Sequence, residues 1–136
     1  MAPKTLSDKA RAFLNEKRFA VLATSNADGT IQQTTMWYLL EGDTILMNTK
    51  KGRVKERNLR RDQRISICIA DGYSYVTIRG TAEIIDNPEL GQRDIFRLAT
   101  RYHGEEKAKR QVAEIYSKDE RITLHLKCEH IQEYML

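Results

Sequence analysis

Short apolar or alternating stretches, separated by tight turns, run through most of the chain and predict a sheet. They cover Phe19–Ser25, Thr30–Leu40, Thr44–Thr49, Arg64–Asp71, Tyr73–Ile85 and Arg121–Leu136. Each has the length and the Val, Ile, Thr and aromatic content of a strand. The turns NADG at 26–29, EGD at 41–43 and DG at 71–72 are short, so successive strands are expected to pair antiparallel.

Helix signals lie between these strands. Ser7 is a predicted N-cap for a helix through Lys17, and Asn87 followed by Pro88 predicts the start of another. A further helix is expected over Glu105–Tyr116, and GRVKERNLRRD, at 52–62, has the composition of a short basic helix.

Together these elements predict one domain over residues 1–136, mainly β with helices, with six mostly antiparallel strands. Gly80 interrupts the alternation of a long strand and predicts a bulge or corner. With such a corner, we expect a closed small barrel rather than an open sheet.

Composition narrows the classes of function. The formal net charge of +4 fits an anionic small ligand, and no aromatic or motif pattern supports nucleic-acid binding. Cys68 and Cys128 lie in alternating runs without a CxxC partner, which predicts reduced thiols and a cytoplasmic protein. No apolar run approaches the ~20 residues of a membrane span, and the N-terminal stretch lacks the apolar core of a signal peptide.

Catalytic signatures are missing from the sequence. It has no GxSxG, P-loop, HExxH or GxGxxG motif. His103, His125 and His130 are too scattered to predict a metal site, so none is expected. If the protein is an enzyme, a cofactor is expected to supply the reactive group.

The segment Asn48–Arg64 is the strongest candidate site. It holds eight Lys or Arg residues against two acids, where a strand is expected to pass into a helix. The free N–H groups and positive dipole of a helix start favour a phosphate, and Arg53 and Lys55 would add charge. A basic face that is merely solvated is the alternative.

The strand Thr30–Leu40 has no clean apolar face. Gln32, Thr34 and Met36 lie on one face because residues two apart share a side of a strand. This mixture predicts a ligand wall or a subunit contact, and an edge strand in contact with water is the alternative. Tyr38, Tyr73 and Tyr75 are candidates to polarise a substrate carbonyl, although aromatic packing is favoured, and no catalytic residue is assigned.

The order of these parts resembles the split-barrel flavin and deazaflavin oxidoreductases, the superfamily of pyridoxamine 5′-phosphate oxidase. The resemblance is carried by FAVLATSNADG, by the strand ending in MWY, by LMNTKKGRVKERNLRRDQR with RISICIA, and by YSYVTIRGTAEII. It implies an FMN-binding type of split barrel and a homodimer with the cofactor between subunits. It also implies a cofactor phosphate held by Arg53 and Lys55, with Asn48 and Thr49 adding hydrogen bonds and Gln32, Thr34 and Met36 beside the ring.

Within this superfamily, the spacing GRxKxRNLRRD is closest to the branch that uses the deazaflavin coenzyme F420. The oxidase branch is expected to have adjacent Arg and Lys, whereas Val54 precedes Lys55 here. F420 also has an acidic tail, which would be attracted by the further cations of the segment: Lys50, Lys51, Arg57 and Arg60. The resemblance therefore implies hydride transfer between F420 and a small reducible organic substrate. The alternatives are an FMN-dependent oxidoreductase and a non-catalytic split barrel that binds a cofactor or haem.

Overall fold

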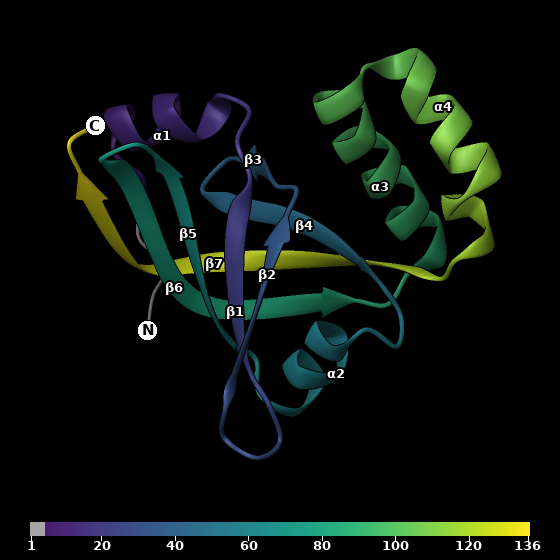
Figure 1. Cartoon of the computed structure of the whole chain (residues 1–136), viewed down its shortest axis with the longest axis horizontal. Coiled ribbons are helices and arrows are strands. Elements are labelled where there is room, and N and C mark those ends of the chain that lie inside the picture. The colour runs from purple at the N-terminus through teal and green to yellow at the C-terminus, as the bar shows by residue number, and fades with distance from the viewer. Residues whose placement is uncertain (1–4) are drawn as a thin grey trace.

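A computed structural model describes residues 5–136, and its strands form one curled antiparallel sheet (Figure 1). The strands are β1 (Ala20–Ser25), β2 (Ile31–Met36), β3 (Leu39–Glu41), β4 (Thr44–Lys50), β5 (Arg64–Asp71), β6 (Ser74–Ile85) and β7 (Arg121–Tyr134). Their order across the sheet is β2-β1-β5-β6-β7-β4-β3, and every pair is antiparallel. The mainly β class with helices is confirmed.

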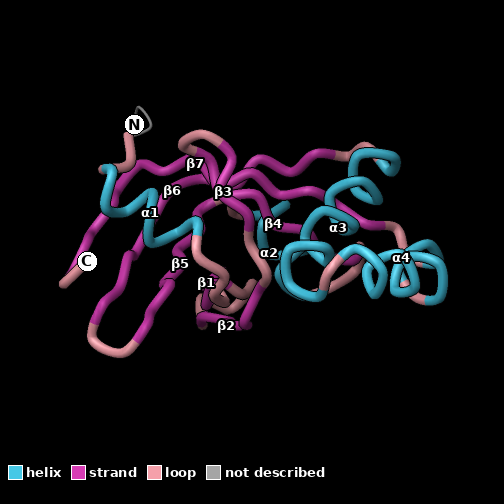
Figure 2. Tube along the Cα trace, turned by 90° about the horizontal axis from the view of Figure 1, so that it is seen from above, coloured by secondary structure: helices cyan, strands magenta, loops and turns pink. Residues whose placement is uncertain are grey.

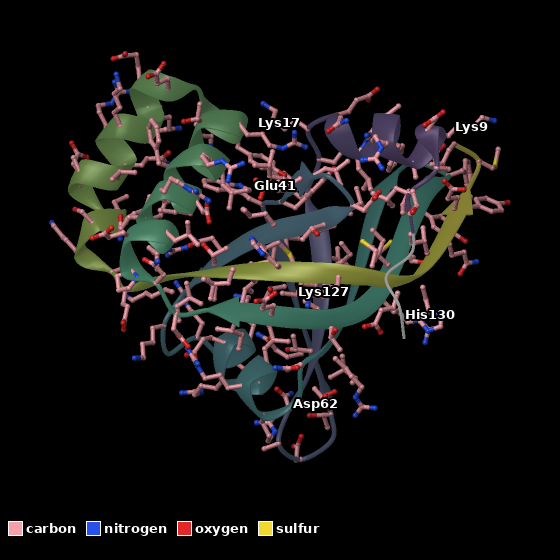
Figure 3. All side chains as sticks on the ribbon, turned by 180° about the vertical axis from the view of Figure 1, so that it is seen from behind. Lys9, Lys17, Glu41, Asp62, Lys127 and His130 are labelled. Carbon is pink, nitrogen blue, oxygen red and sulfur yellow. The ribbon has the colours of Figure 1, made fainter. Side chains whose placement is uncertain are left out.

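The helices cover the ends and one flank of the sheet. They are α1 (Asp8–Asn15), α2 (Val54–Arg61), α3 (Pro88–His103) and α4 (Glu105–Glu114), with a 3-10 turn at Tyr116–Lys118. Two views show α3 and α4 together at one end, and α1 at the other (Figures 1 and 2). In the view of Figure 3, Asp62, just after α2, lies below the long strands β6 and β7, whereas Glu41 and Lys17 lie above them.

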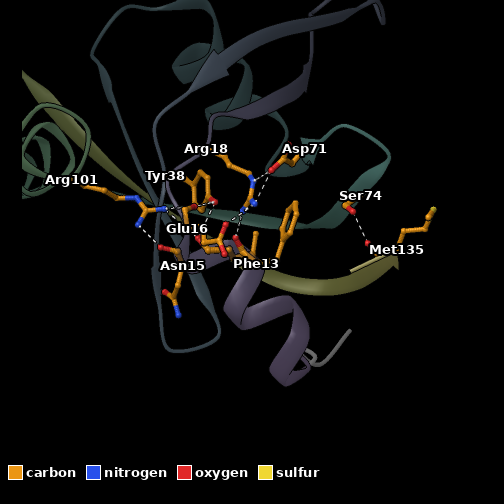
Figure 4. A network of polar contacts seen from close by, with 10 residues as sticks. Phe13, Asn15, Glu16, Arg18, Tyr38, Asp71, Ser74, Arg101 and Met135 are labelled. Atoms are coloured by element: carbon orange, nitrogen blue, oxygen red, sulfur yellow. Dashed lines mark hydrogen bonds and ion pairs between the residues drawn. The ribbon is translucent and has the colours of Figure 1, made fainter.

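The described residues form seven strands rather than the predicted six, because the stretch Thr30–Leu40 breaks at Trp37 and Tyr38. The Tyr38 side chain is buried, and its hydroxyl donates to the carbonyl oxygens of Leu14 at 2.9 Å and Glu16 at 3.2 Å. Its backbone N–H donates to the Tyr102 hydroxyl at 3.1 Å instead of to a strand. Arg101 and Arg18 join the same network (Figure 4). This packing separates β2 from β3.

The prediction of a closed barrel was wrong for the described residues. β2 and β3 lie at opposite edges of the sheet and are not paired with each other, so the sheet is a curled half-barrel. The bulge predicted at Gly80 is confirmed, because the β6–β7 register shifts between Arg79 and Gly80. There Gly80 approaches β7 closely enough that an added Cβ would lie 1.8 Å from the carbonyl oxygen of Lys127.

The core lies inside the curl of the sheet. Alternate residues of β5, including Ile65, Ile67 and Ile69, are buried there, as their spacing requires. Leu14 of α1 and Leu59 of α2 join the same core. α3 instead packs on β7 and β4, where Leu98 is buried outside this core cluster.

Two predicted helix starts are confirmed. The Ser7 hydroxyl accepts from Ala10 N–H at 3.0 Å, and the Asn87 side chain accepts from Leu90 N–H at 3.1 Å with Pro88 in the first turn. Each cap satisfies a backbone N–H group that has no partner within the helix.

Among the described residues, none of the helices is long and apolar enough to cross a membrane.

Gly80→Ala is expected to lower the free energy of unfolding by at least about 3 kcal/mol, because the methyl group would overlap a strand carbonyl that cannot move without breaking the sheet. Glu83→Ala, on the same strand and exposed, removes only a surface ion pair and should change it by less than about 1 kcal/mol. Urea denaturation of both variants checks the difference, and equal stabilities would contradict the close approach at Gly80.

Candidate functional site

A groove opens where β2 and β4 face each other without pairing. β3 pairs only with Thr44–Leu46, so in the described chain β4 has no strand on that side from Met47 to Lys50. The groove has a volume of about 230 Å³. It is lined mainly by aromatic and aliphatic side chains, with two polar groups near β4: Phe19, Thr35, Met36, Trp37, Asn48, Ile95, Leu98, Tyr116 and Arg121.

Stacked aromatic rings stiffen one wall of this groove. The ring of Tyr102 stacks on Trp37 with centroids 5.2 Å apart and on Phe19 with centroids 5.6 Å apart. His103 meets Trp37 edge to face at 5.0 Å. Such packing restricts the rotation of Trp37 and gives the groove a flat apolar wall, at whose edge Phe19 remains 59% exposed.

The start of α2 follows directly after β4, as predicted. Arg53 is the N-cap residue, and no side chain caps the first turn. The backbone N–H groups of Val54 and Lys55 have no acceptor among residues 5–136. The Glu56 carboxylate accepts from Gly52 N–H at 2.8 Å and bonds Arg60, so it is already engaged. Two free donors therefore remain at the positive end of the helix.

Three cations gather at this helix start. The pKa of Lys55 is lowered, first by burial and then by the positive charges of Arg53 and Arg121. Within the described residues, neither Arg53 nor Lys55 forms an ion pair. Arg121 bonds Asp119, but the charges of Arg53 and Lys55 repel each other without an acidic partner in the described residues, and an anion would relieve that cost.

Arg121, the first residue of β7, was missed by the sequence analysis. Its side chain is 11% exposed and lines the groove. Its Nε donates to the Asn48 side-chain oxygen at 2.9 Å, and its guanidinium lies over the Tyr116 ring at 5.1 Å. No local pattern distinguishes it, because it lies far from the basic segment in sequence and is brought there only by pairing of Lys50 with Arg121 across β4 and β7.

The further cations predicted to attract an acidic tail are mostly paired with acids. Lys50 bonds Asp119 at 3.3 Å and Lys51 bonds Glu120 at 3.2 Å. Arg60 bonds Glu56 and also Asp86. Arg57 is exposed and forms no ion pair within residues 5–136. Of this set, Arg57 alone keeps its charge uncompensated in the described chain.

The two polar residues predicted at the end of β4 face opposite sides. Asn48 lies on the face covered by α3, where its amide is held by Gly91 and Arg121. Thr49 alternates with it, and its side chain is buried. The two residues therefore do not present hydrogen-bonding groups in the same direction.

The face of β2 formed by Gln32, Thr34 and Met36 points inward, and only Met36 lines the groove. Gln32 accepts from Thr24 at 3.5 Å, and Thr24 accepts from Asn58 of α2 at 3.1 Å. The Thr34 hydroxyl is buried and has no hydrogen-bond partner among the described residues.

The candidate tyrosines have different surroundings. Burial raises the pKa of Tyr38 to about 12, and both bonds of its hydroxyl serve packing. Tyr75 stacks on Tyr134 with centroids 5.1 Å apart, and Tyr73 is 85% exposed. None of these three tyrosines lines the groove.

In residues 5–136, no group of three His, Cys, Asp or Glu side chains could hold a metal ion.

A curled antiparallel half-barrel with a cationic helix start beside an open strand edge defines the class of protein as a split barrel. The sequence profile of the pyridoxamine 5′-phosphate oxidase family matches residues 6–133. The chain therefore belongs to this family.

Solved structures agree with this assignment. The conserved hypothetical protein Rv2991 from Mycobacterium tuberculosis is 30% identical, with a TM-score of 0.79 over 98% of this chain and 88% of that one. An F420 reductase is 22% identical, with a TM-score of 0.75 over 93% and 98% of the two chains. A putative pyridoxamine 5′-phosphate oxidase from Listeria innocua is 19% identical, with a TM-score of 0.71 over 93% and 95%. The last two likenesses show the fold.

Lys55→Met is expected to stabilise the ligand-free protein by about 0.5 kcal/mol or more. The lowered pKa means that the protonated Lys55 opposes folding; this penalty is full below the lowered pKa, shrinks as pH rises through it, and is gone above the ordinary lysine pKa of 10.5. The gain should therefore be seen at pH 7 and should shrink at alkaline pH. Thermal unfolding at both pH values checks it, with the exposed Lys107→Met as control. A loss of stability at pH 7 would contradict the crowding of cations.

Proposed function

We propose that this protein is an oxidoreductase that binds coenzyme F420 and transfers a hydride between the coenzyme and a small reducible organic substrate. The observation that carries the proposal is the pair Arg53 and Lys55, which have no acidic partner among the described residues and lie where α2 leaves two N–H groups free. These are the donors and charges that a phosphate takes.

The residues around the groove fit such a coenzyme. Arg53 and Lys55, which lie next to the groove residue Arg121, would hold the phosphate. Met36, Trp37 and Phe19 in the groove would exclude water from a flat ring. When bound, the deazaflavin supplies the hydride chemistry, and the chain supplies position and an electrostatic field. A groove of about 230 Å³ is smaller than a typical ligand pocket of roughly 300–1,000 Å³, so a second subunit is expected to complete it.

The choice of F420 over FMN rests on the basic segment. Arg57 adds a free positive charge to α2 beyond the two that a terminal phosphate needs, and an acidic tail would use it. The departure at Val54 from adjacent Arg and Lys supports the same choice. Lys50, Lys51 and Arg60 are paired with acids and so are less available to an acidic tail. FMN, whose only anionic group is its phosphate, is therefore the second candidate.

A homodimer is part of the proposal. The outer face of β1 and β2 exposes Val21 at 37% and Ile31 at 62%, and the uncharged residues Ala23, Gln33 and Thr35 share that face. An apolar and uncharged sheet face of this kind is typical of a surface covered by a partner. A second copy seated there would also lie close to Thr35, which lines the groove.

The double substitution Arg53→Ala and Lys55→Ala is expected to weaken F420 binding by about 3 kcal/mol or more, since each charge-assisted bond contributes roughly 1.5–3 kcal/mol. The melting temperature should not fall, because the two cations repel each other. Fluorescence titration measures the affinity. Lys107→Ala together with Arg110→Ala, two exposed cations of α4, is the matched control. Unchanged affinity would remove the phosphate site.

Parallel titrations with F420 and FMN decide between the two coenzymes. We expect F420 to bind more tightly than FMN, and its affinity to fall as pH rises through the lowered pKa of Lys55, because neutral Lys55 no longer attracts phosphate. Tighter binding of FMN would select the flavin alternative. Binding without turnover of any reducible substrate would indicate a non-catalytic carrier.

Val21→Arg is expected to convert the dimer to a monomer, because a charge would be buried within the uncharged face that the partner covers. Sedimentation velocity at micromolar concentration measures the change. Glu83→Arg, an exposed charge reversal on β6, is the control and should leave the dimer intact. If the wild-type chain is already monomeric at that concentration, the dimer proposal is wrong.

A further inference from the structure

We propose that Arg121 is a third cation of the phosphate site and that Asn48 acts as a positioning residue that aims it, instead of bonding the phosphate directly. The proposal deepens the proposed function, on which the identity of the ligand rests. It assigns to the site a residue from the far end of the chain, and it gives Asn48 a different role from the one predicted.

The amide of Asn48 is clamped between two partners. Its Nδ2 donates to the carbonyl oxygen of Gly91 at 2.9 Å, and its Oδ1 accepts from Arg121 Nε at 2.9 Å. The residue is 5% exposed, so water does not compete freely. The carbonyl oxygen of Gly91 can only accept a hydrogen bond and the Nε–H of Arg121 can only donate one, so the Asn48 amide has one satisfactory orientation. The side chain of Arg121 is therefore held on its Nε edge.

Gly91 makes this clamp possible. A Cβ added there would lie 2.0 Å from the carbonyl oxygen of Arg121, so the first turns of α3 lie directly on the start of β7. One turn further on, the buried Asp94 accepts from the Thr123 hydroxyl at 2.7 Å. Thr123 is also the strand partner of Asn48. Helix, strand and clamp are thus fixed relative to one another.

The rest of the Arg121 guanidinium remains available. Its Nη1 reaches Asp119 at 3.5 Å, a carboxylate that Lys50 shares at 3.3 Å. Among residues 5–136, Nη2 has no acceptor. The ring of Tyr116 lies against the guanidinium and limits its motion. Arg121 therefore presents a free donor edge and an incompletely neutralised charge.

Arg121 is also near the other two cations, because Arg53 N–H donates to the carbonyl oxygen of Lys50 at 3.2 Å and Lys50 is the strand partner of Arg121. Its charge is among the causes that lower the pKa of Lys55, and that of Arg53 acts on Arg121 in turn. The nearest acid on α2, Glu56, is occupied by Gly52 N–H and Arg60. Three cations converging on one place, one of them clamped from behind, form a built anion site.

The test is a titration with inorganic pyrophosphate, which needs no coenzyme. Isothermal calorimetry is run on the full chain with the wild type, Asn48→Ala, Arg121→Ala, Arg121→Lys and the double variant Asn48→Ala with Arg121→Ala. Arg110→Ala, an exposed cation of α4, is the control. Arg121→Ala and Asn48→Ala should each weaken binding about tenfold or more, and Arg121→Lys should lose less because it retains charge.

The decisive result is the double variant. If Asn48 acts only through Arg121, the double variant should bind no more weakly than Arg121→Ala alone. Losses that multiply would show an independent role for Asn48 and would overturn the positioning claim. Unchanged affinity in Arg121→Ala, or no binding of pyrophosphate to the wild type, would overturn the three-cation site.

A second variant, Asn48→Asp, tests the role of Asn48 if Asn48→Ala does not fold. This variant keeps the shape of the side chain but sets a carboxylate against the Gly91 carbonyl and neutralises Arg121. Asn48→Asp should also weaken pyrophosphate binding about tenfold or more, and wild-type affinity in this variant would overturn the positioning role of Asn48.

An independent measurement is the pKa of Lys55, followed by NMR of the methylated side chain. This pKa should rise in Arg121→Ala, and an unmoved pKa would contradict the proximity of the two cations.

Parallel coenzyme titrations keep the two proposals distinguishable. If pyrophosphate shows the expected pattern but neither F420 nor FMN binds, the proposed function is wrong and the anion site stands. If a coenzyme binds through Arg53 and Lys55 while Arg121→Ala binds it and pyrophosphate as the wild type does, the proposed function stands and the role of Arg121 is wrong.

Discussion

The burial of Tyr38 is the constraint on which the rest of this structure depends. Its hydroxyl and backbone N–H are bonded to α1 and α3, so the chain cannot continue as a single strand from β2 into β3. β2 and β3 therefore lie at opposite edges of the sheet. The edge of β4 beyond Leu46 is left without a neighbour on that side in the described chain, and the groove lies there. A closed barrel would have filled this space with paired backbone.

The site concentrates positive charge at a cost to the folded state. Half of the cations in the segment Asn48–Arg64 have acidic partners, among them Lys50, Lys51 and Arg60. Arg53 and Lys55 form no ion pair within the described residues, and burial near like charges lowers the pKa of Lys55. Selection for stability alone would disperse or pair such charges. Their arrangement at a helix start without a side-chain cap is what an anion-binding site requires.

The α3 layer does more than cover the sheet. It contributes the aliphatic wall of the groove through Ile95 and Leu98. It also brings Gly91 against the start of β7, where the Asn48 amide joins helix and strand. A binding surface supported by two strands and a helix is held more rigidly than one on loops. The half-barrel and the helical layer therefore act on the same site from two sides.

Sequence pattern alone determined the antiparallel strands, the Ser7 and Asn87 caps, the bulge at Gly80 and the helix start after Gly52, because each depends on local periodicity or turn chemistry. Only the tertiary structure decided the break at Tyr38, the covering of the Asn48 face of β4 by α3, and the presence of Arg121 at the site. These depend on which elements pack together. Arg121 is far from Lys55 in sequence, and only strand pairing and the close approach of α3 at Gly91 bring its charge to the groove.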